Sequence, residues 1–232
     1  MKIFAFSVAA VAFAAPVEDS FDIVPTIIGG VPAEQGEFPW QISQRRGTLE
    51  TPGSHMCGGS IGSEKYIITA AHCKFRTNGV IFAYGTNQWK DTDNLAVASL
   101  YTSHPNYNSR TIDFDYAYVT LETDLVWSEY IQPINIVPAN ENSKNNNEKY
   151  GDTATTAGWG YSQHDAAGNP IVIPDDLQKL DLPLNSWDTC VGYWGDPEEN
   201  PVLGRYTERM QCCGGQGSSS CMGDSGGPLM VI

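Results

Sequence analysis

Residues 223–228 of the chain read GDSGGP, and Cys221 stands shortly before them. Read as G-x-S-x-G, this stretch matches the nucleophile elbow of the α/β-hydrolases. That fold requires its acid and its histidine after the serine, whereas only seven residues follow Ser225 and none is Asp, Glu or His. Chain order therefore excludes the elbow. A plain glycine-rich turn is the simple alternative, but it leaves the Asp and the Ser within the turn unexplained.

Two more short motifs contain the residue types that a reactive serine needs. Residues 69–73 read TAAHC, and residues 113–119 read DFDYAYV, an acid that opens an apolar strand. Each motif is weak alone, because a histidine beside a cysteine is most often structural and an aspartate before a strand is usually a turn residue. Taken together, the three motifs place His72, Asp115 and Ser225 in that order along the chain.

This set of residues has the chemistry to activate a serine hydroxyl, which is a poor nucleophile near neutral pH. His72 would take the proton of Ser225 as a general base and return it to the leaving amine. Asp115 would fix the tautomer of His72 and stabilise the imidazolium. The backbone N–H groups of Gly223 and Ser225 would bind the developing oxyanion, and a glycine at position 223 leaves room for that geometry.

The first residues of the chain predict export. Met1-Lys2 is a short positive start, residues 3–12 are apolar apart from Ser7, and residues 12–14 (AFA) form a small-x-small cleavage site. We therefore expect a signal peptide over residues 1–14 that has no part in the fold. A membrane helix is the weaker alternative, because the apolar run is well short of the ~20 residues that a span needs. The expected location is extracellular, so the six cysteines can form disulfides.

The predicted secretion also helps to decide between a zinc site and a disulfide in one group of histidines and cysteines. The ligand types of a zinc site occur at four positions: His55, Cys57, His72 and Cys73. Their spacing does not match the usual zinc pattern, and an exported chain favours a Cys57–Cys73 disulfide. Closing such a loop stabilises a fold by about 3 kcal/mol. We therefore expect neither a metal nor another cofactor.

Composition limits the class of protein and its partners. The chain has 232 residues, of which 41% are hydrophobic, and its 13 Lys+Arg against 27 Asp+Glu give a formal net charge of −14. These proportions are typical of a globular protein. Because phosphate and anionic lipid surfaces require clustered Lys and Arg, we expect binding neither to nucleic acid nor to a membrane.

The rest of the chain predicts short strands separated by turns, with no helical period of useful length. Runs of β-branched or aromatic residues occur at 41–43, 66–69, 80–84, 116–121, 153–157 and 178–182. Such spacing is typical of an all-β barrel or sandwich. Residues 139–152 (ANENSKNNNEKYGD) favour a solvated connection between two halves, with a long surface loop within one domain as the alternative.

From Ile27 to its end, the chain resembles the chymotrypsin family of trypsin-like serine proteases. The order His, Asp, Ser is the order of that family. Further matches are IIGG at 27–30, FPWQIS at 38–43, CGGS at 57–60 and GWG at 158–160. The joint match is highly specific, and it implies an all-β fold of two antiparallel barrels with the active site in the cleft between them.

The resemblance divides the chain into successive parts. We expect a signal peptide (1–14), a propeptide (15–26), an N-terminal barrel (27–138), a connecting segment (139–152) and a C-terminal barrel (153–232). The family continues beyond the position of Ile232 with a further strand and a helix. The second barrel is therefore expected to be truncated and to keep an open strand edge.

The resemblance also implies activation by proteolysis. The family frees an amine at the position of Ile27, which pairs with Asp224 and shapes the oxyanion hole. Before cleavage, Asp224 would be held by His55 and Ser43, which match the family's zymogen contacts, although a merely packed or exposed histidine is an equal alternative. An activating protease is thus an expected partner, and Thr26 before the cleavage point indicates that this protease is not trypsin-like.

The family pattern assigns four of the six cysteines. Cys190 and Cys212 match a family disulfide, in addition to the Cys57–Cys73 pair. Cys213 is extra, and the family partner of Cys221 would lie past the end of the chain.

One family disulfide is replaced at both of its positions. Ala154 and Val231 stand where many members of the family have cysteines. Because both replacements are apolar, we expect the two side chains to face each other and to join two strands through hydrophobic burial.

Two classes of function remain open. The favoured one is a secreted serine endopeptidase made as a zymogen, which acts on polypeptides and is open to protein inhibitors. The alternative is a non-catalytic secreted homologue that binds or inhibits other proteins, as in the glucanase-inhibitor type. Retention of His72, Asp115 and Ser225 argues for the enzyme, whereas Thr26 and the truncated second barrel argue for the alternative.

Ser219 predicts the substrate preference. It matches the base of the family's primary specificity pocket, where trypsin-type members carry an Asp that pairs with Lys or Arg. Because a serine hydroxyl cannot neutralise a cation, we predict faster cleavage after Phe, Tyr, Leu or Ala. The measurement is kcat/KM for such peptides against matched Arg and Lys peptides, and a preference for Arg or Lys would contradict the prediction.

Overall fold

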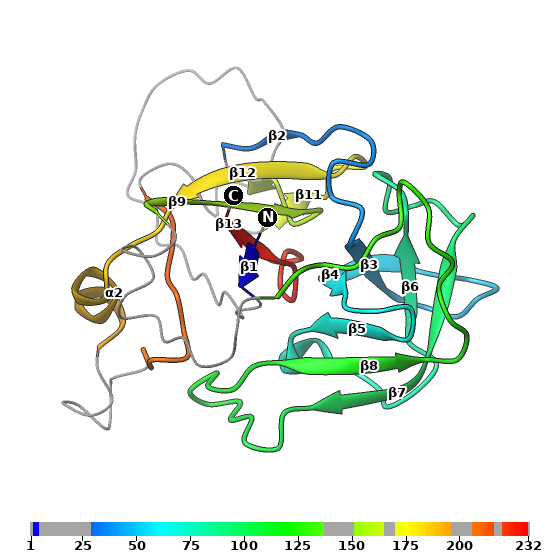
Figure 1. Cartoon of the computed structure of the whole chain (residues 1–232), viewed down its shortest axis with the longest axis horizontal. Helices are drawn as coiled ribbons and strands as arrows, with labels where there is room; N and C mark the ends of the chain where they lie inside the picture. The colour runs from blue at the N-terminus through cyan, green and yellow to red at the C-terminus, as the bar shows by residue number, and fades with distance from the viewer. Residues whose placement is uncertain are drawn as a thin grey trace.

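The structure, a computed structural model, describes residues 2–4, 29–136, 151–164, 170–195, 206–215 and 220–231. Within these ranges the regular elements are strands, apart from one 3₁₀ helix, η1 (Ala71–Cys73), and one α-helix, α2 (Trp187–Trp194) (Figure 1). No described helix is long and apolar enough to cross a membrane. The expected all-β class is confirmed.

Six strands close into a barrel in the first half of the chain. Their order around the barrel is β3-β4-β5-β8-β7-β6, and every neighbouring pair is antiparallel. The strands are β3 (Gln41–Arg46), β4 (Ser54–Ile61), β5 (Tyr66–Thr69), β6 (Ile81–Tyr84), β7 (Leu95–Ser103) and β8 (Ala117–Leu121). Closure pairs the backbone of every strand on both sides and leaves no exposed edge.

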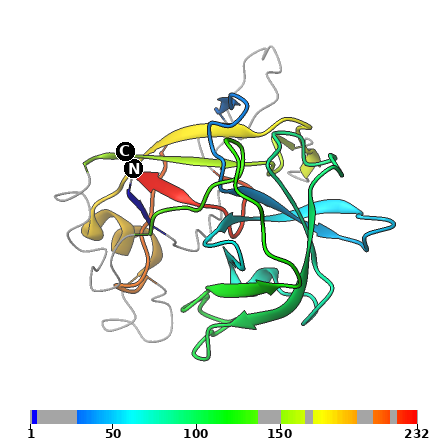
Figure 2. The same ribbon diagram turned by 45° about the vertical axis from the view of Figure 1, so that its right-hand side comes forward.

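The second half forms an open sheet beside the barrel (Figures 1 and 2). Its strand order is β1-β13-β9-β12-β2, and β10 and β11 form a separate antiparallel pair. The strands are β1 (Lys2–Phe4), β2 (Val31–Pro32), β9 (Thr153–Gly158), β10 (Gln163–His164), β11 (Pro170–Val172), β12 (Gln178–Pro183) and β13 (Leu229–Val231). A closed barrel followed by an incomplete second one agrees with the expected chymotrypsin-type architecture.

The two halves share one hydrophobic core. A single buried cluster contains Ile42, Ile67 and Phe82 of the barrel together with Trp159 and Met230 of the second half, and each of these side chains is 0% exposed. Full burial of a large apolar side chain contributes about 1.5–3 kcal/mol to stability. The shared core therefore fixes the barrel and the second sheet against each other at the surface where the candidate site lies.

Three features of the second half differ from the expectations. Val31–Pro32 pairs with β12 rather than with the barrel, so the N-terminal part of the 27–138 segment crosses to the second sheet. Lys2–Phe4, within the expected signal peptide, pairs with β13 and covers the strand edge expected to be open. Helix α2 was not anticipated; Ser186 caps its N-terminus through a hydroxyl that accepts a hydrogen bond from the Thr189 amide.

Strand β13 enters the sheet in the register expected from the replaced disulfide. Leu229 is opposite Thr156 and Met230 is opposite Thr155, so the next step places Val231 opposite Ala154. Ala154 and Val231 are 1% and 3% exposed and belong to one small buried cluster. Apolar packing thus joins β9 to β13.

We predict that Ala154→Cys with Val231→Cys forms a disulfide and raises the free energy of unfolding by up to about 2–4 kcal/mol. The background should carry Cys213→Ala, because Cys213 packs against the same cluster and would compete for either new thiol. Mass measurement without reductant detects the bridge, and the two single cysteine variants are the controls. Two free thiols in the double variant would contradict the register.

Candidate active site

His72 lies on η1, at the rim of the closed barrel. Two buried side chains hold this short helix: the Tyr101 hydroxyl donates to the Ala70 carbonyl at 2.9 Å, and the Gln44 amide donates to the Cys73 carbonyl at 2.7 Å. The His72 side chain itself is 33% exposed. Its backbone is therefore fixed while its ring remains accessible to a substrate.

Asp115 holds His72 through both of its carboxylate oxygens. Oδ2 lies 2.6 Å from Nδ1 of the ring, and Oδ1 accepts from the backbone N–H of His72 at 2.8 Å. The Asp115 side chain is 0% exposed. Because an ionised carboxylate only accepts hydrogen bonds, Nδ1 carries a proton and Nε2 presents its lone pair. This is the tautomer that a general base requires.

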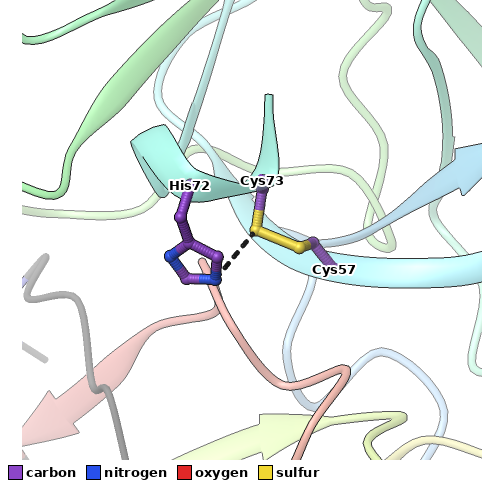
Figure 3. Close-up of side chains that lie close together, drawn as sticks. All are labelled: Cys57, His72 and Cys73. Atoms are coloured by element: carbon purple, nitrogen blue, oxygen red, sulfur yellow. Dashed lines mark hydrogen bonds between the residues drawn. A yellow bond between two sulfur atoms is a disulfide. The ribbon is translucent and has the colours of Figure 1, made fainter. Parts of the chain in front are cut away.

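Ser225 lies in the turn before β13, next to the disulfide of Cys57 and Cys73. The Ser225 carbonyl accepts a hydrogen bond from the Gly58 amide at 2.8 Å and lies 3.6 Å from Cys73 Sγ. Nε2 of His72 lies 3.7 Å from the same sulfur, as the dashed line in Figure 3 shows. The disulfide therefore brings the base and the backbone of the candidate nucleophile together.

The hydroxyl of Ser225 and Nε2 of His72 are not hydrogen-bonded in the described structure. In ligand-free enzymes this contact is often long, and it shortens when substrate binds. The three residues of the predicted set are thus gathered at one place, with the Asp–His contact formed.

Cys57, His72 and Cys73 place three possible metal-ligand atoms within 4.8 Å of one another. The two sulfurs are joined in a disulfide of 2.04 Å, so neither is the thiolate that a metal needs. The remaining member of the hypothetical zinc set, His55, uses both ring nitrogens in other contacts. Cys57, His72 and Cys73 are therefore a disulfide with a histidine beside it, and not a zinc site.

Comparison with known proteins agrees with this geometry. Residues 27–232 match the family model described as Trypsin. The chain is also 32% identical to Trypsin delta of Drosophila erecta over 210 residues, which cover 88% of this chain and 73% of that protein. The chain belongs to the trypsin family. This is a family of serine-type peptidases.

Asp224 of this trypsin-family chain is buried. Its side chain accepts one hydrogen bond from the Gly160 amide at 2.7 Å and one from the Cys221 amide at 2.8 Å. Burial raises the pKa of Asp224 to about 6, and these two hydrogen bonds oppose the rise only in part. Within the described residues, no positive group contacts the carboxylate.

His55 and Ser43 do not make the zymogen contact with Asp224 that the resemblance implies. Nε2 of His55 lies 2.9 Å from the Gly223 carbonyl, and Nδ1 lies 2.7 Å from the Ser43 hydroxyl. Because a carbonyl only accepts, Nε2 carries the proton and the hydroxyl donates to Nδ1. Burial lowers the pKa of His55 to about 4, so the ring is neutral. Asp224 faces the Gly160 amide instead, and His55 binds the neighbouring residue.

The remaining predicted residues fall into two groups. Ile27 and Ser219 lie outside the described residues. Cys190 and Cys212 form the second disulfide, and Cys213, in neither disulfide, is buried enough to raise the pKa of its thiol to about 12.

Gly160 was noted in the sequence only as part of a family landmark, yet its amide binds the carboxylate of Asp224. A Cβ atom at this position would overlap the carboxylate of Asp224, whose two oxygens are both held by amides. Only glycine therefore lets the carboxylate reach the Gly160 amide.

We predict that Gly160→Ala lowers the free energy of unfolding by about 1–3 kcal/mol, because the buried carboxylate must leave its two donors. Gly192→Ala is the matched control: position 192 is exposed on α2 with nothing near a new Cβ, and alanine there stabilises by up to about 1 kcal/mol. Urea unfolding measures both. Equal stability of Gly160→Ala and the wild type would contradict the assignment.

Proposed function

We propose that this chain is a secreted serine endopeptidase made as a zymogen, which hydrolyses peptide bonds through an acyl-enzyme. The observation that carries the proposal is the contact of the fully buried Asp115 with Nδ1 of His72 at 2.6 Å, beside the turn that holds Ser225. A buried aspartate that fixes the basic tautomer of a partly exposed histidine has a direct role in activating a nucleophile.

The reaction uses groups of the chain and water. Ser225 Oγ attacks the substrate carbonyl and passes its proton to Nε2 of His72. The N–H groups of Gly223 and Ser225 bind the oxygen that becomes negative. Collapse of the tetrahedral intermediate breaks the C–N bond, and His72 protonates the leaving amine. Water then repeats the sequence on the ester and frees Ser225.

Activation by cleavage before Ile27 follows from the electrostatics of Asp224. A buried carboxylate that contacts only two amides in the described structure is poorly stabilised as an anion. A free amine at Ile27 would supply a positive charge to this carboxylate. A trypsin-like activator cleaves after Lys or Arg and is not expected to cut after Thr26. The proposed activating partner is therefore a protease with a different substrate preference.

The proposed substrate class is polypeptides cleaved after apolar residues. The support is Ser219, which offers no negative charge to a Lys or Arg side chain. A role as a non-catalytic binding or inhibitory protein is less consistent with the chain, because all three residues of the His–Asp–Ser set are retained.

We predict that the chain beginning at Ile27 is labelled by a fluorophosphonate at Ser225, and that Ser225→Ala abolishes labelling and reduces turnover by about a millionfold. The uncut chain should label far more slowly, since its Asp224 lacks the amine. The matched control is Ser99→Ala, an exposed serine on β7, which should label like the wild type. Failure of the cut wild-type chain to label would instead favour the non-catalytic alternative.

A further inference from the structure

Two residues shortly before Asp115 have an unusual backbone. Ile112 and Phe114 both adopt the left-handed region, with φ of 58° and 55°. A β-branched or bulky residue rarely takes this conformation, because its Cβ crowds the backbone. Two such residues directly before Asp115 require interactions that hold them in place.

Asp113, which lies between these two residues, makes the strongest polar contact of the loop. Its Oδ2 accepts from a terminal nitrogen of Arg209 at 2.7 Å, and its Oδ1 accepts from Nε of Arg209 at 3.0 Å. The Thr207 hydroxyl and the Phe114 amide also donate to Oδ1, at 3.2 and 2.9 Å. One carboxylate thus joins the strained loop of the barrel to a segment of the second half.

Phe114 is held by the same arginine. The Arg209 guanidinium lies 4.5 Å from the centre of the Phe114 ring, and the His104 ring stacks on Phe114 at 4.7 Å with an angle of 8° between planes. The Phe114 carbonyl accepts a hydrogen bond from the Tyr116 amide at 2.8 Å, across Asp115. Fixing Phe114 therefore fixes the backbone on both sides of the catalytic aspartate.

Arg209 is itself anchored. The hydroxyl of Tyr206 donates to the Met210 carbonyl at 3.0 Å and accepts from the Cys212 amide at 3.2 Å, and Cys212 is bonded to Cys190 of α2. Burial raises the pKa of Asp113, but the hydrogen bonds and charge of Arg209 outweigh it, so the carboxyl stays ionised. The Arg209–Asp113 ion pair is therefore anchored to the second half through the hydrogen bonds of Tyr206 and the Cys190–Cys212 disulfide.

An isolated surface ion pair contributes little to stability, and Arg209 and Asp113 are 41% and 17% exposed. This pair differs in three ways: its geometry is bidentate, it includes a stacked ring, and it ends two residues from Asp115. We propose that Arg209 is a positioning residue, which acts through Asp113 and Phe114 to hold Asp115 against His72. The inference deepens the proposed peptidase function and rests on it.

The test is the neutral double variant Asp113→Asn with Arg209→Gln, made in the chain beginning at Ile27. It removes one charge of each sign, so the net charge near His72 is unchanged. Only the contacts of Arg209 with Asp113 and Phe114, the Arg209 clamp, are lost. Because a displacement of about 1 Å in a catalytic group reduces rates by up to about 100-fold, we expect kcat per titrated Ser225 to fall by about 10- to 100-fold. KM should change by less than about threefold if Arg209 acts only through the position of Asp115.

Two further variants distinguish positioning from general stabilisation. Arg209→Lys keeps the charge but not the two-pronged geometry, so its kcat should lie between those of the double variant and the wild type. Glu37→Gln with Lys179→Gln removes another ion pair between the halves, at 2.5 Å and with 29% and 30% exposure, and should leave kcat within about twofold. If the double variant keeps the kcat of this control, the proposal is overturned.

A second measurement separates this proposal from the peptidase function. The Nδ1 proton of His72, shared with Asp115 at 2.6 Å, should give a low-field NMR resonance, assigned by its loss in His72→Ala. We expect the resonance to shift or broaden in the double variant and to stay unchanged in the Glu37/Lys179 control. An unaltered resonance in the double variant would overturn the proposal even if the wild type cleaves no peptide, whereas absent labelling of the wild type would defeat only the peptidase function.

Discussion

The contact between the Asp115 carboxylate and His72 constrains the rest of the structure, because a carboxylate with no solvent exposure must find all of its donors within the fold. Strand pairing supplies them. Thr69 of β5 lies opposite Ala117 of β8 in an antiparallel pair. His72 follows Thr69 by three residues and Asp115 precedes Ala117 by two, so both lie beyond the same end of this strand pair. The register of two barrel strands thus sets the geometry of the base before any contact with the second half.

The nucleophile comes from the other half, and close backbone approach brings it to the barrel. The Gly58 amide binds the Ser225 carbonyl, and a Cβ atom at Gly58 would lie 3.1 Å from Gly227. Gly226 has φ of 83°, and a Cβ there would overlap the Thr69 hydroxyl. Glycine is therefore required at position 226 and favoured at position 58, which explains why the serine is embedded in a glycine-rich turn.

Strands defined by local side-chain pattern were predictable, whereas features that depend on distant contacts were not. Tyr66–Thr69 was predicted with its observed bounds, because an aromatic residue is followed there by three consecutive β-branched residues. Ser54–Ile61 was missed, since its Gly59 packs against the side chain of Ile42, a contact that no local pattern reveals. Helix α2 is only eight residues long and depends on a disulfide to Cys212. His55 binds the carbonyl of Gly223 rather than the carboxylate of the next residue, Asp224, and only the local geometry of that turn decides between the two.

Two buried aspartates in this molecule have opposite electrostatic situations. Asp115 contacts a histidine that would become positive in the proposed reaction, whereas Asp224 contacts only amides in the described structure, and its pKa rises to about 6. Because the folded state binds the Asp224 proton more tightly than the unfolded chain, whose value is 3.8, Asp224 adds stability below pH 3.8 that is lost as the pH rises to about 6. Near neutral pH Asp224 is therefore an anion that no positive group of the described residues contacts, in the same turn as Ser225. A positive group brought to Asp224 would lower its pKa and stabilise the turn that presents Gly223 and Ser225, so the arrangement of the active site depends on whether that charge is present.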